Sequence, residues 1–425
     1  MEPTELPALP DARLAGLRAE AEALQSATVE LRREIHRNPE QGLRLPVTQA
    51  AVLKALDGLP LELTLGKSTS SVTAVLRGGK PGPAVLLRGD MDALPVTERT
   101  GEEFSSRHEG VMHACGHDLH TAGLVGAARL LAARAPELTG DVVFMFQPGE
   151  EGHDGAGHMI EEGVLEAAGR PVEAAYGLHV TSSKQPKGLF SARPGPLMAA
   201  SAGLSVRVIG AGGHGSSPHR SLDPMPAACE MVLALQTMVT RRFDVFEPVV
   251  ITVGTFHAGT RRNVIPDEAT FEATVRAFTP DALAQVQELA VRLCEDIAAA
   301  HGLRAEATFT GEYPLTANDA AEHDFLAATV REIFGEDRYE LMENPITGSE
   351  DFSRVLERVP GAFVFLGATV ADDPETAPTN HSPLAQFDDS VLADGAALLA
   401  ELAVRRLGSA SPAQQQPESA VAATP

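Results

Sequence analysis

The chain has 425 residues, of which 44% are hydrophobic and 22% charged, so it has the composition of a globular protein of two to three domains. Its 58 acidic and 34 basic residues give a formal net charge of −24, which argues against nucleic acid or an anionic membrane as the main partner. Three scattered cysteines, no run of ~20 apolar residues and no signal-peptide pattern predict a reduced, cytoplasmic protein without a membrane span.

The first part of the chain, residues 1–195, is predicted to be an α/β domain that binds metal. Two of its strands are continuous apolar runs, as expected of a sheet that is covered on both faces. Alternating strands and helices predict a largely parallel sheet. The predicted helices span about 11–37 and 121–134, and the predicted strands span 71–76, 84–87, 141–146 and 174–178.

Residues 196–311 show a different order of elements. Strands are predicted at 204–209, 249–255, 269–278 and 304–310, with helices at 223–242 and 280–300. This β-α-β-β-α-β order predicts a ferredoxin-like domain inserted into the α/β domain. Residues 312–408 resume the α/β pattern, with helices at 322–334, after 348 and at 388–406 and a strand at 362–366. Residues 409–425 are rich in Pro, Gln, Ser and Ala, which predicts a disordered tail.

Candidate metal ligands follow several of the predicted strands. Open α/β sheets bind their ligands beyond the carboxyl ends of the strands, so these segments are expected to converge. Cysteine, histidine and carboxylate side chains that converge in a reduced protein are typical of a transition-metal site. The residues concerned are Cys115, His117, Glu150, Glu151, His179 and His381.

The Cys115–His117 loop and the Glu150–Glu151 pair indicate hydrolytic chemistry. A cysteine thiolate can bridge two metal ions. Adjacent side chains of an extended chain point in opposite directions, so one glutamate can bind metal while the other faces the reacting water. Hydrolysis needs both a metal that polarises a carbonyl and a carboxylate that moves a proton. Alone, a glutamate pair is usually surface charge and a buried cysteine a small hydrophobe, so the interpretation depends on all four segments together.

Two polar loops of the inserted domain are further candidates. His214 lies in a Gly-flanked loop that can reach into a cleft. The alternative interpretation is a turn with a surface histidine that has no catalytic function. The loop that contains Asn263 is able to hold a carboxylate, and its alternative is a solvated hairpin. His113 and His120 are expected to support the ligands rather than to bind metal, and His36 is expected to cap a helix. The remaining histidines are assigned to surface or loop positions: His108, His153, His158, His219, His257, His301 and His323.

Nine motifs occur in order between about residues 30 and 390: RREIHRNPE, RGDMDALPV, MHACGHDLHTA, QPGEEG, YGLHV, GGHGSSPH, RRNVIPDEATFEATVRAF, TGSEDF and NHSP. Together they resemble the amidohydrolases related to hippurate hydrolase and to the plant indoleacetyl-amino-acid hydrolases, a branch of the aminoacylase–carboxypeptidase metallopeptidase family. The resemblance implies a zinc-peptidase-like mixed sheet flanked by helices. It also implies a ferredoxin-like lid that serves dimerisation, and a binuclear metal centre.

The resemblance also implies roles for individual residues. Glu150 would be the general base, His214 would stabilise the oxyanion, often in the partner subunit's centre, and Asn263 would contact the substrate carboxylate. At the position of Asp90 the wider family has a histidine ligand. Five residues would bind two divalent ions of zinc, manganese, nickel or cobalt: Cys115, His117, Glu151, His179 and His381.

The expected function is metal-dependent hydrolysis of the amide bond of an N-acyl amino acid with an acetyl, benzoyl or aryl-acyl group. The products would be a carboxylate and a free amino acid, and the expected assembly is a homodimer or a higher homo-oligomer. Two alternatives stay open. One is a dipeptidase or carboxypeptidase with the same centre. The other is a catalytically silent metal-binding or scaffolding protein, against which the Glu150–Glu151 pair argues.

Overall fold

The computed structural model describes residues 16–409, so residues 11–15 of the first predicted helix and residues 410–425 of the predicted tail lie outside it. The described chain divides into two compact units. One contains residues 16–192, 321–340 and 359–409, and the other contains residues 193–320 and 341–358. The segment 341–358, which the sequence-based boundaries assigned to the catalytic domain, is thus grouped with the inserted segment.

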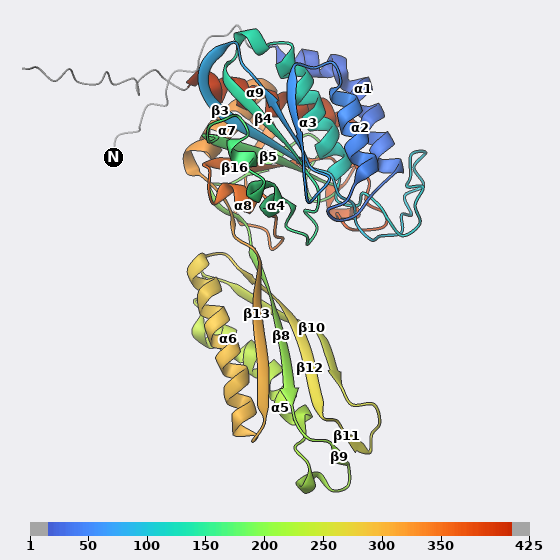
Figure 1. Ribbon diagram of the computed structural model, residues 1–425, viewed down its shortest axis with the longest axis vertical. Helices are drawn as coiled ribbons and strands as arrows, with labels where there is room; N and C mark the ends of the chain where they lie inside the picture. The colour runs from blue at the N-terminus through green and yellow to red at the C-terminus, as the bar shows by residue number, and fades with distance from the viewer. Residues whose placement is uncertain (1–15, 410–425) are drawn as a thin grey trace, which may run out of the picture. The chain divides into compact units, whose positions relative to one another are not determined.

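The first unit is built on an eight-stranded sheet (Figure 1). Its strands span Leu61–Leu65 (β1), Val72–Leu76 (β2), Lys80–Asp90 (β3), Thr139–Gln147 (β4), Ala174–Thr181 (β5), Phe190–Ala192 (β6), Tyr339–Leu341 (β15) and Gly361–Gly367 (β16). They lie in the order β1-β2-β4-β3-β5-β16-β6-β15. The middle strands β4, β3, β5 and β16 are parallel, and the β1-β2, β2-β4 and β16-β6 pairs are antiparallel. The sheet is therefore mixed with a parallel centre.

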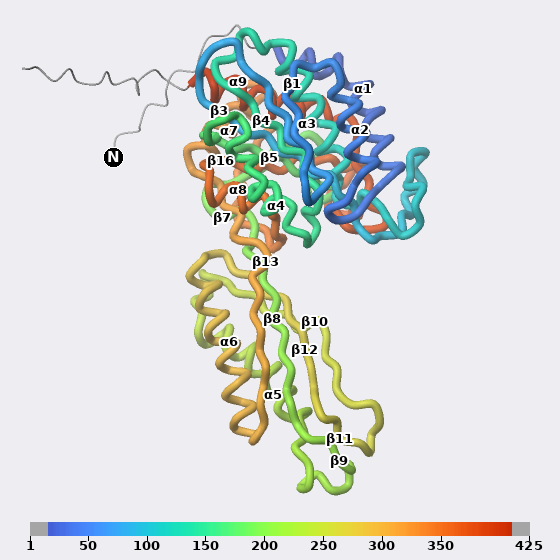
Figure 2. Tube along the Cα trace, viewed as in Figure 1, coloured from blue at the N-terminus to red at the C-terminus, as the bar shows by residue number. Residues whose placement is uncertain are grey.

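Helices flank this sheet. They span Leu17–Arg37 (α1), Pro46–Leu56 (α2), His117–Ala132 (α3), Gly155–Glu161 (α4), Ala320–Phe334 (α7) and Leu392–Ser409 (α9). The helices α1, α3 and α9 pack against one another, and α3 and α9 contact β3. Figure 2 shows α1, α2 and α3 together along one side of the unit. The structure confirms the predicted α/β fold with a large mixed sheet flanked by helices. Within residues 16–409, no helix has both the length and the apolar character needed to cross a lipid bilayer.

Burial explains the apolar runs that mark the middle strands. Every residue of β16 and the last seven residues of β3 are buried. A strand that is covered on both faces has no solvent side, so its apolar residues follow one another without alternation. The parallel register pairs Leu86 of β3 with Val143 of β4, and Leu178 of β5 with Val364 of β16.

The second unit contains a four-stranded antiparallel sheet with two long helices on one face (Figure 1). Its main elements are Ala200–Ile209 (β8), Pro224–Arg242 (α5), Val249–Ala258 (β10), Glu268–Ala277 (β12), Pro280–Ala300 (α6) and Arg304–Tyr313 (β13). The spatial order β10-β12-β8-β13 is that of a ferredoxin-like fold. Shorter elements complete the unit: Gly195–Met198 (β7), Gly213–His214 (β9), Val264–Ile265 (β11), Thr316–Asn318 (β14) and Ser353–Leu356 (α8).

Two glycines of α3 differ in the space around them. A Cβ added at Gly126 would lie 3.0 Å from Ala396 Cβ of α9 and 3.2 Å from Thr28 Cγ2 of α1. The missing side chain lets the three helices approach closely. At Gly123, the helix backbone and the chain neighbours aside, an added Cβ would have no atom of the described residues within 4 Å. Gly123 also lines a cavity of about 20 Å³.

The same substitution is therefore expected to have opposite effects at these two positions. Gly123→Ala should raise the free energy of unfolding by about 1 kcal/mol, because alanine favours the helix interior and the methyl group enters empty space. Gly126→Ala, the matched control in the same helix, should lower it because α1 or α9 must shift. Urea denaturation measures both changes. A Gly126→Ala variant as stable as Gly123→Ala would contradict the described helix packing.

Candidate metal centre

The carboxyl ends of the parallel strands meet at one edge of the sheet, and the predicted ligands lie there. β3 ends at Asp90 and β4 ends at Gln147. Glu150 and Glu151 follow β4 after two intervening residues, and His179 lies near the end of β5. Parallel pairing thus brings together side chains that are far apart in the sequence, at the edge where open α/β sheets bind ligands.

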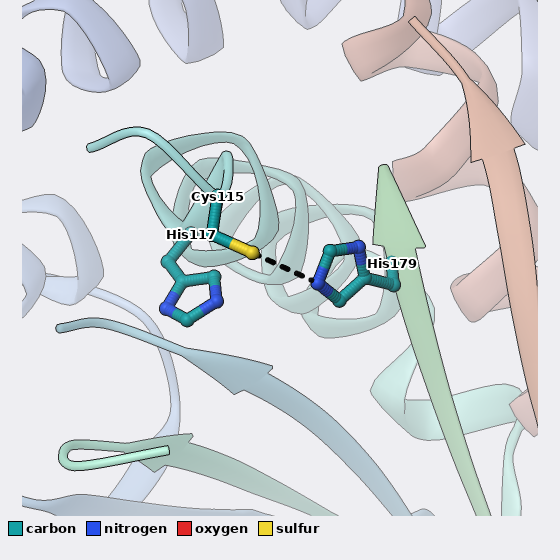
Figure 3. A group of neighbouring side chains, drawn as sticks. All are labelled: Cys115, His117 and His179. Atoms are coloured by element: carbon teal, nitrogen blue, oxygen red, sulfur yellow. Dashed lines mark hydrogen bonds between the residues drawn. The ribbon is translucent and has the colours of Figure 1, made fainter. Parts of the chain in front are cut away.

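Cys115 and His117 lie on either side of Gly116 at the start of α3 (Figure 3). Gly116 has a φ of 84°, and an added Cβ would lie 2.4 Å from Val180 Cγ2, so this turn requires glycine. The turn directs Cys115 toward β5, where its Sγ lies 3.4 Å from His179 Nε2. His117 is the first residue of α3, and the prediction that it lies in the loop ahead of the helix was wrong.

His381 reaches the same place from a distant segment. Its amide donates a hydrogen bond to Ala114 O at 2.8 Å, and Asn380 Nδ2 donates to Cys115 O at 3.3 Å. These bonds hold the segment after β16 against the start of α3. As a result, His381 Nε2 lies 3.2 Å from Cys115 Sγ and 3.1 Å from Glu151 Oε1.

A buried aspartate holds the glutamate pair. The amides of Glu150 and Glu151 donate to the two carboxylate oxygens of Asp92, at 2.9 and 3.0 Å. Gly149 has a φ of 73°, and an added Cβ there would lie 2.5 Å from Leu43 Cδ2. The pair lies in a turn, so the assumption of an extended chain was wrong. Hydrogen bonds to Asp92, and not strand alternation, determine the backbone conformation of the pair.

The assembled side chains fit divalent metal ions. The ligand atoms of Cys115, His117 and His179 lie within 4.8 Å of one another, and so do those of Cys115, Glu151 and His381. Cys115 belongs to both groups, so one thiolate can serve two ions. Ligands bound to one tetrahedral ion at ~2.0–2.3 Å lie ~3.3–3.8 Å apart. The separations of 3.2 and 3.4 Å around Cys115 Sγ are close to that spacing.

His117 has two buried ring nitrogens, and a metal ion would satisfy one of them. Its side chain is fully buried, and neither ring nitrogen makes a hydrogen bond within the described residues. Carboxylate oxygens of Asp90 and Asp92 lie 3.4 Å from Nε2 and 3.6 Å from Nδ1. A buried polar atom without a partner is costly, and a metal ion removes that cost. Burial lowers the pKa of His179 well below its usual value, so its ring is in the neutral form that binds metal.

A network of buried charges supports the start of α3. Arg32 Nε donates to Asp118 Oδ2 at 2.6 Å, and His36 lies between Asp118 and Glu98, at 2.8 and 3.3 Å. Burial disfavours the charged form of Asp118, but Arg32 and His36 outweigh it and hold the pKa of this carboxyl well below its usual range. The expectation that His36 caps a helix was wrong, because the Asp118 carboxylate binds its ring. The sequence argument missed this network, although RREIH contains Arg32 and His36 and CGHD contains Asp118.

The second unit places His214 and Asn263, the other two predicted site residues, next to each other. β9 and β11 pair with His214 opposite Val264, and the Gly215 amide donates to Asn263 O at 2.9 Å. The Ser216 amide donates to His214 Nδ1 at 3.2 Å. This nitrogen is therefore an acceptor, and the proton of the neutral ring is on Nε2. His214 thus presents an N–H donor at the tip of its ring.

Known proteins of similar sequence and structure have related activities. Residues 86–405 match the model of peptidase family M20/M25/M40. The chain is 36% identical to a thermostable carboxypeptidase of Saccharolobus solfataricus, over 92% of this chain and 98% of the relative. It is 38% identical to an IAA-amino acid hydrolase of Arabidopsis thaliana, over 89% of this chain and 85% of the relative.

A solved structure from Bacillus subtilis, a dinuclear metal-binding peptidase from the M20 family, is also similar. It has a TM-score of 0.78 and 32% identity, and the match covers 91% of this chain and 99% of that one. The family match spans most of the chain, and the relatives match over nearly their whole length. The chain therefore belongs to peptidase family M20/M25/M40 and is a metal-dependent hydrolase, in agreement with the resemblance of its sequence motifs.

Proposed function

We propose that this protein hydrolyses the amide bond of N-acyl amino acids and releases a carboxylate and a free amino acid. The observation that carries the proposal is the turn that holds two glutamates beside the Cys–His cluster. Ligand atoms of His117, Glu150 and Glu151 lie within 4.8 Å of one another, so a carboxylate that binds metal has a second carboxylate next to it. A silent metal-binding protein has no use for the second carboxylate.

The proposed roles follow from the chemistry of the side chains. Bound divalent ions of zinc, manganese, nickel or cobalt polarise an amide carbonyl and lower the pKa of water. Glu150, which is buried, takes the proton of the attacking water and returns it to the leaving amine. The proposed ligands of two ions are Cys115, His117, Glu151, His179 and His381.

A carboxypeptidase or dipeptidase activity at the same centre is the second candidate, and the 36% identity to a carboxypeptidase favours it. The two candidates differ in whether the pocket accepts a charged amino group. Purified protein reloaded with each of the four metals is assayed on N-acetyl, N-benzoyl and indoleacetyl amino acids and on dipeptides. We expect the higher kcat/KM for an acyl amino acid. A preference for dipeptides contradicts the proposal, and no turnover with any metal favours a silent protein.

The inserted unit is proposed to act as a lid and a dimerisation surface. The Nε2 proton of His214 suits an oxyanion donor, and the neighbouring Asn263 suits a contact to the substrate carboxylate. The edge strand β10 and the exposed side chains of Leu233, Val245 and Phe246 support a homodimer or a higher homo-oligomer. We place the protein in the cytoplasm because its three cysteines are too few and too scattered for a disulfide framework. Its acidic composition argues against a nucleic-acid or membrane partner, and the proposed reaction implies a small-molecule substrate.

Replacement of Glu150 tests the proposed base. Glu150→Gln is expected to keep its metal and to lower kcat ~10²–10⁴-fold or more, because an amide cannot accept the proton. Glu151→Gln is the matched control and is expected to lose metal. Elemental analysis and steady-state kinetics measure both effects. Normal kcat or metal loss in Glu150→Gln would mean that the two roles are wrongly assigned.

Thiol labelling tests Cys115 as a ligand. Cys115 is expected to resist alkylation in the metal-loaded protein and to react after chelation, because a bound thiolate is shielded. The other cysteines are internal controls: Cys229 is exposed and should react in both states, and burial raises the pKa of the Cys294 thiol to about 12, so it should react in neither. Mass spectrometry of both states locates the label. Equal labelling of Cys115 in the two states would remove it from the ligand set.

Replacement of His214 tests the proposed oxyanion donor. His214→Ala is expected to lower kcat ~10²–10³-fold without changing metal content, because such a donor acts mainly in the transition state. His219→Ala is a control in the same loop and should keep normal kcat. Normal kcat in His214→Ala would mean that this loop is a surface turn without a catalytic role.

Mixed oligomers test whether His214 acts in a partner subunit. If it does, inactive His214→Ala and inactive Glu150→Gln subunits should regain activity on mixing, because one centre of a mixed dimer then has both intact residues. The absence of recovery after verified subunit exchange would mean that the lid serves its own chain.

A further inference from the structure

Three buried polar residues lie beside the proposed ligands but outside the ligand set and the catalytic pair. Arg88 and Asp90 lie at the end of β3, and His120 lies in the first turn of α3. Their exposed fractions are 1%, 0% and 4%. Side chains of this kind are rarely buried so completely unless they are paired.

Hydrogen bonds join these residues in a chain. Arg88 donates from Nη1 to Asp90 Oδ2 at 2.7 Å and from Nε to Gln147 Oε1 at 2.9 Å. His120 Nδ1 lies 2.5 Å from Asp90 Oδ1, and the Val180 amide donates to His120 Nε2 at 2.8 Å. An amide N–H only donates, so Nε2 is an acceptor and the ring proton is on Nδ1, where it donates to Asp90.

These hydrogen bonds place Arg88, Asp90 and His120 next to the proposed metal site and not among its ligands. The ligand atoms of Asp90, His117 and His120 lie within 4.8 Å of one another, a spacing that would also suit a metal ion. However, both oxygens of Asp90 and both ring nitrogens of His120 already have hydrogen-bond partners within the chain. His120 therefore has no free nitrogen to offer a metal.

The last residue of this series of hydrogen bonds, Val180, lies next to a proposed ligand. Val180 directly follows His179, and its carbonyl lies 2.8 Å from His179 Nδ1. A proton on Nδ1 leaves His179 Nε2 unprotonated, and this is the nitrogen that lies 3.4 Å from Cys115 Sγ. The rings of His120 and His179 are 4.7 Å apart between centroids. Val180 is thus bound on one side to His120 and on the other to the ligand ring.

We propose that Arg88, Asp90 and His120 are positioning residues for the His179 ligand. They anchor the Val180 amide, so that the Val180 carbonyl orients the His179 ring and its Nε2 faces the metal site. This inference rests on the proposed function and its ligand set. It goes further because it assigns a task to three residues that touch neither the metal nor the substrate in that proposal.

Two substitutions of His120 test the two hydrogen bonds of its ring separately. His120→Gln keeps an acceptor near the position of Nε2, whereas His120→Asn keeps a donor near the position of Nδ1. The probe is Co²⁺ alone, added to the metal-stripped full-length protein. Its visible spectrum reports the geometry of the ligands and the thiolate, and a titration gives its Kd. His323→Asn is the control, because His323 is equally buried and makes its two hydrogen bonds to Asp324 and Tyr339.

We expect His120→Asn to weaken Co²⁺ binding ~10–100-fold and to change the spectrum of the fully loaded site, as loss of a group that orients a ligand does. His120→Gln should bind Co²⁺ more tightly than His120→Asn and restore most of the spectrum. A purely structural role would lower stability and leave the loaded spectrum unchanged, as expected for His323→Asn. Equal weakening in both His120 variants, or a His120→Asn variant that behaves like the control, would overturn the proposal.

The wild-type protein provides a test that does not depend on whether the variants fold. ¹⁵N NMR of the histidine-labelled protein should show the proton of His120 on Nδ1, and a proton on Nε2 would overturn the proposal. The Co²⁺ spectrum of the wild-type protein tests the proposed ligand set independently of the His120 proton. A loaded site without a thiolate band would remove Cys115 from the ligands. With the band present, a negative result for His120 concerns the positioning role alone.

Discussion

The parallel pairing of β4, β3, β5 and β16 is the constraint on which the metal centre depends. Antiparallel neighbours end on opposite edges of a sheet, whereas parallel strands end on the same edge. The residues that follow β3 and β4 therefore arrive beside the end of β5. The helix α3 begins at that edge and brings Cys115 and His117 with it. His381 is added by a backbone hydrogen bond to Ala114 and not by the sheet itself.

Paired charges surround this edge. Arg32 is bound to Asp118 and Arg88 is bound to Asp90, and all four side chains are almost completely buried. Removal of one partner from such a pair is costly because it leaves an uncompensated buried charge. The same bonds restrict how the backbone near the ligands can move. These buried ion pairs therefore act on the conformation around the proposed ligands, apart from any contribution to the free energy of unfolding.

The two units organise their polar residues independently. Each has its own hydrophobic core, built between sheet and helices. In the first unit, Val180 determines which nitrogen of His120 carries the proton. In the second unit, Ser216 does the same for His214. In both places a backbone amide selects the tautomer, and the tautomer decides which ring nitrogen donates and which accepts.

The sequence by itself determined the fold class and the β-α-β-β-α-β order, and it predicted which candidate ligands follow the strand ends. These depend on local features: apolar runs, turn residues and short motifs. Only the tertiary structure decided that Asp92 holds the Glu150 amide, that Arg32 and His36 surround Asp118, and that His120 anchors Val180. These partners are 58, 86, 82 and 60 residues apart in the chain, respectively. The periodicity of a segment reports which face is buried, but it does not report which distant polar group meets that face, because that pairing exists only after the strands and helices have packed.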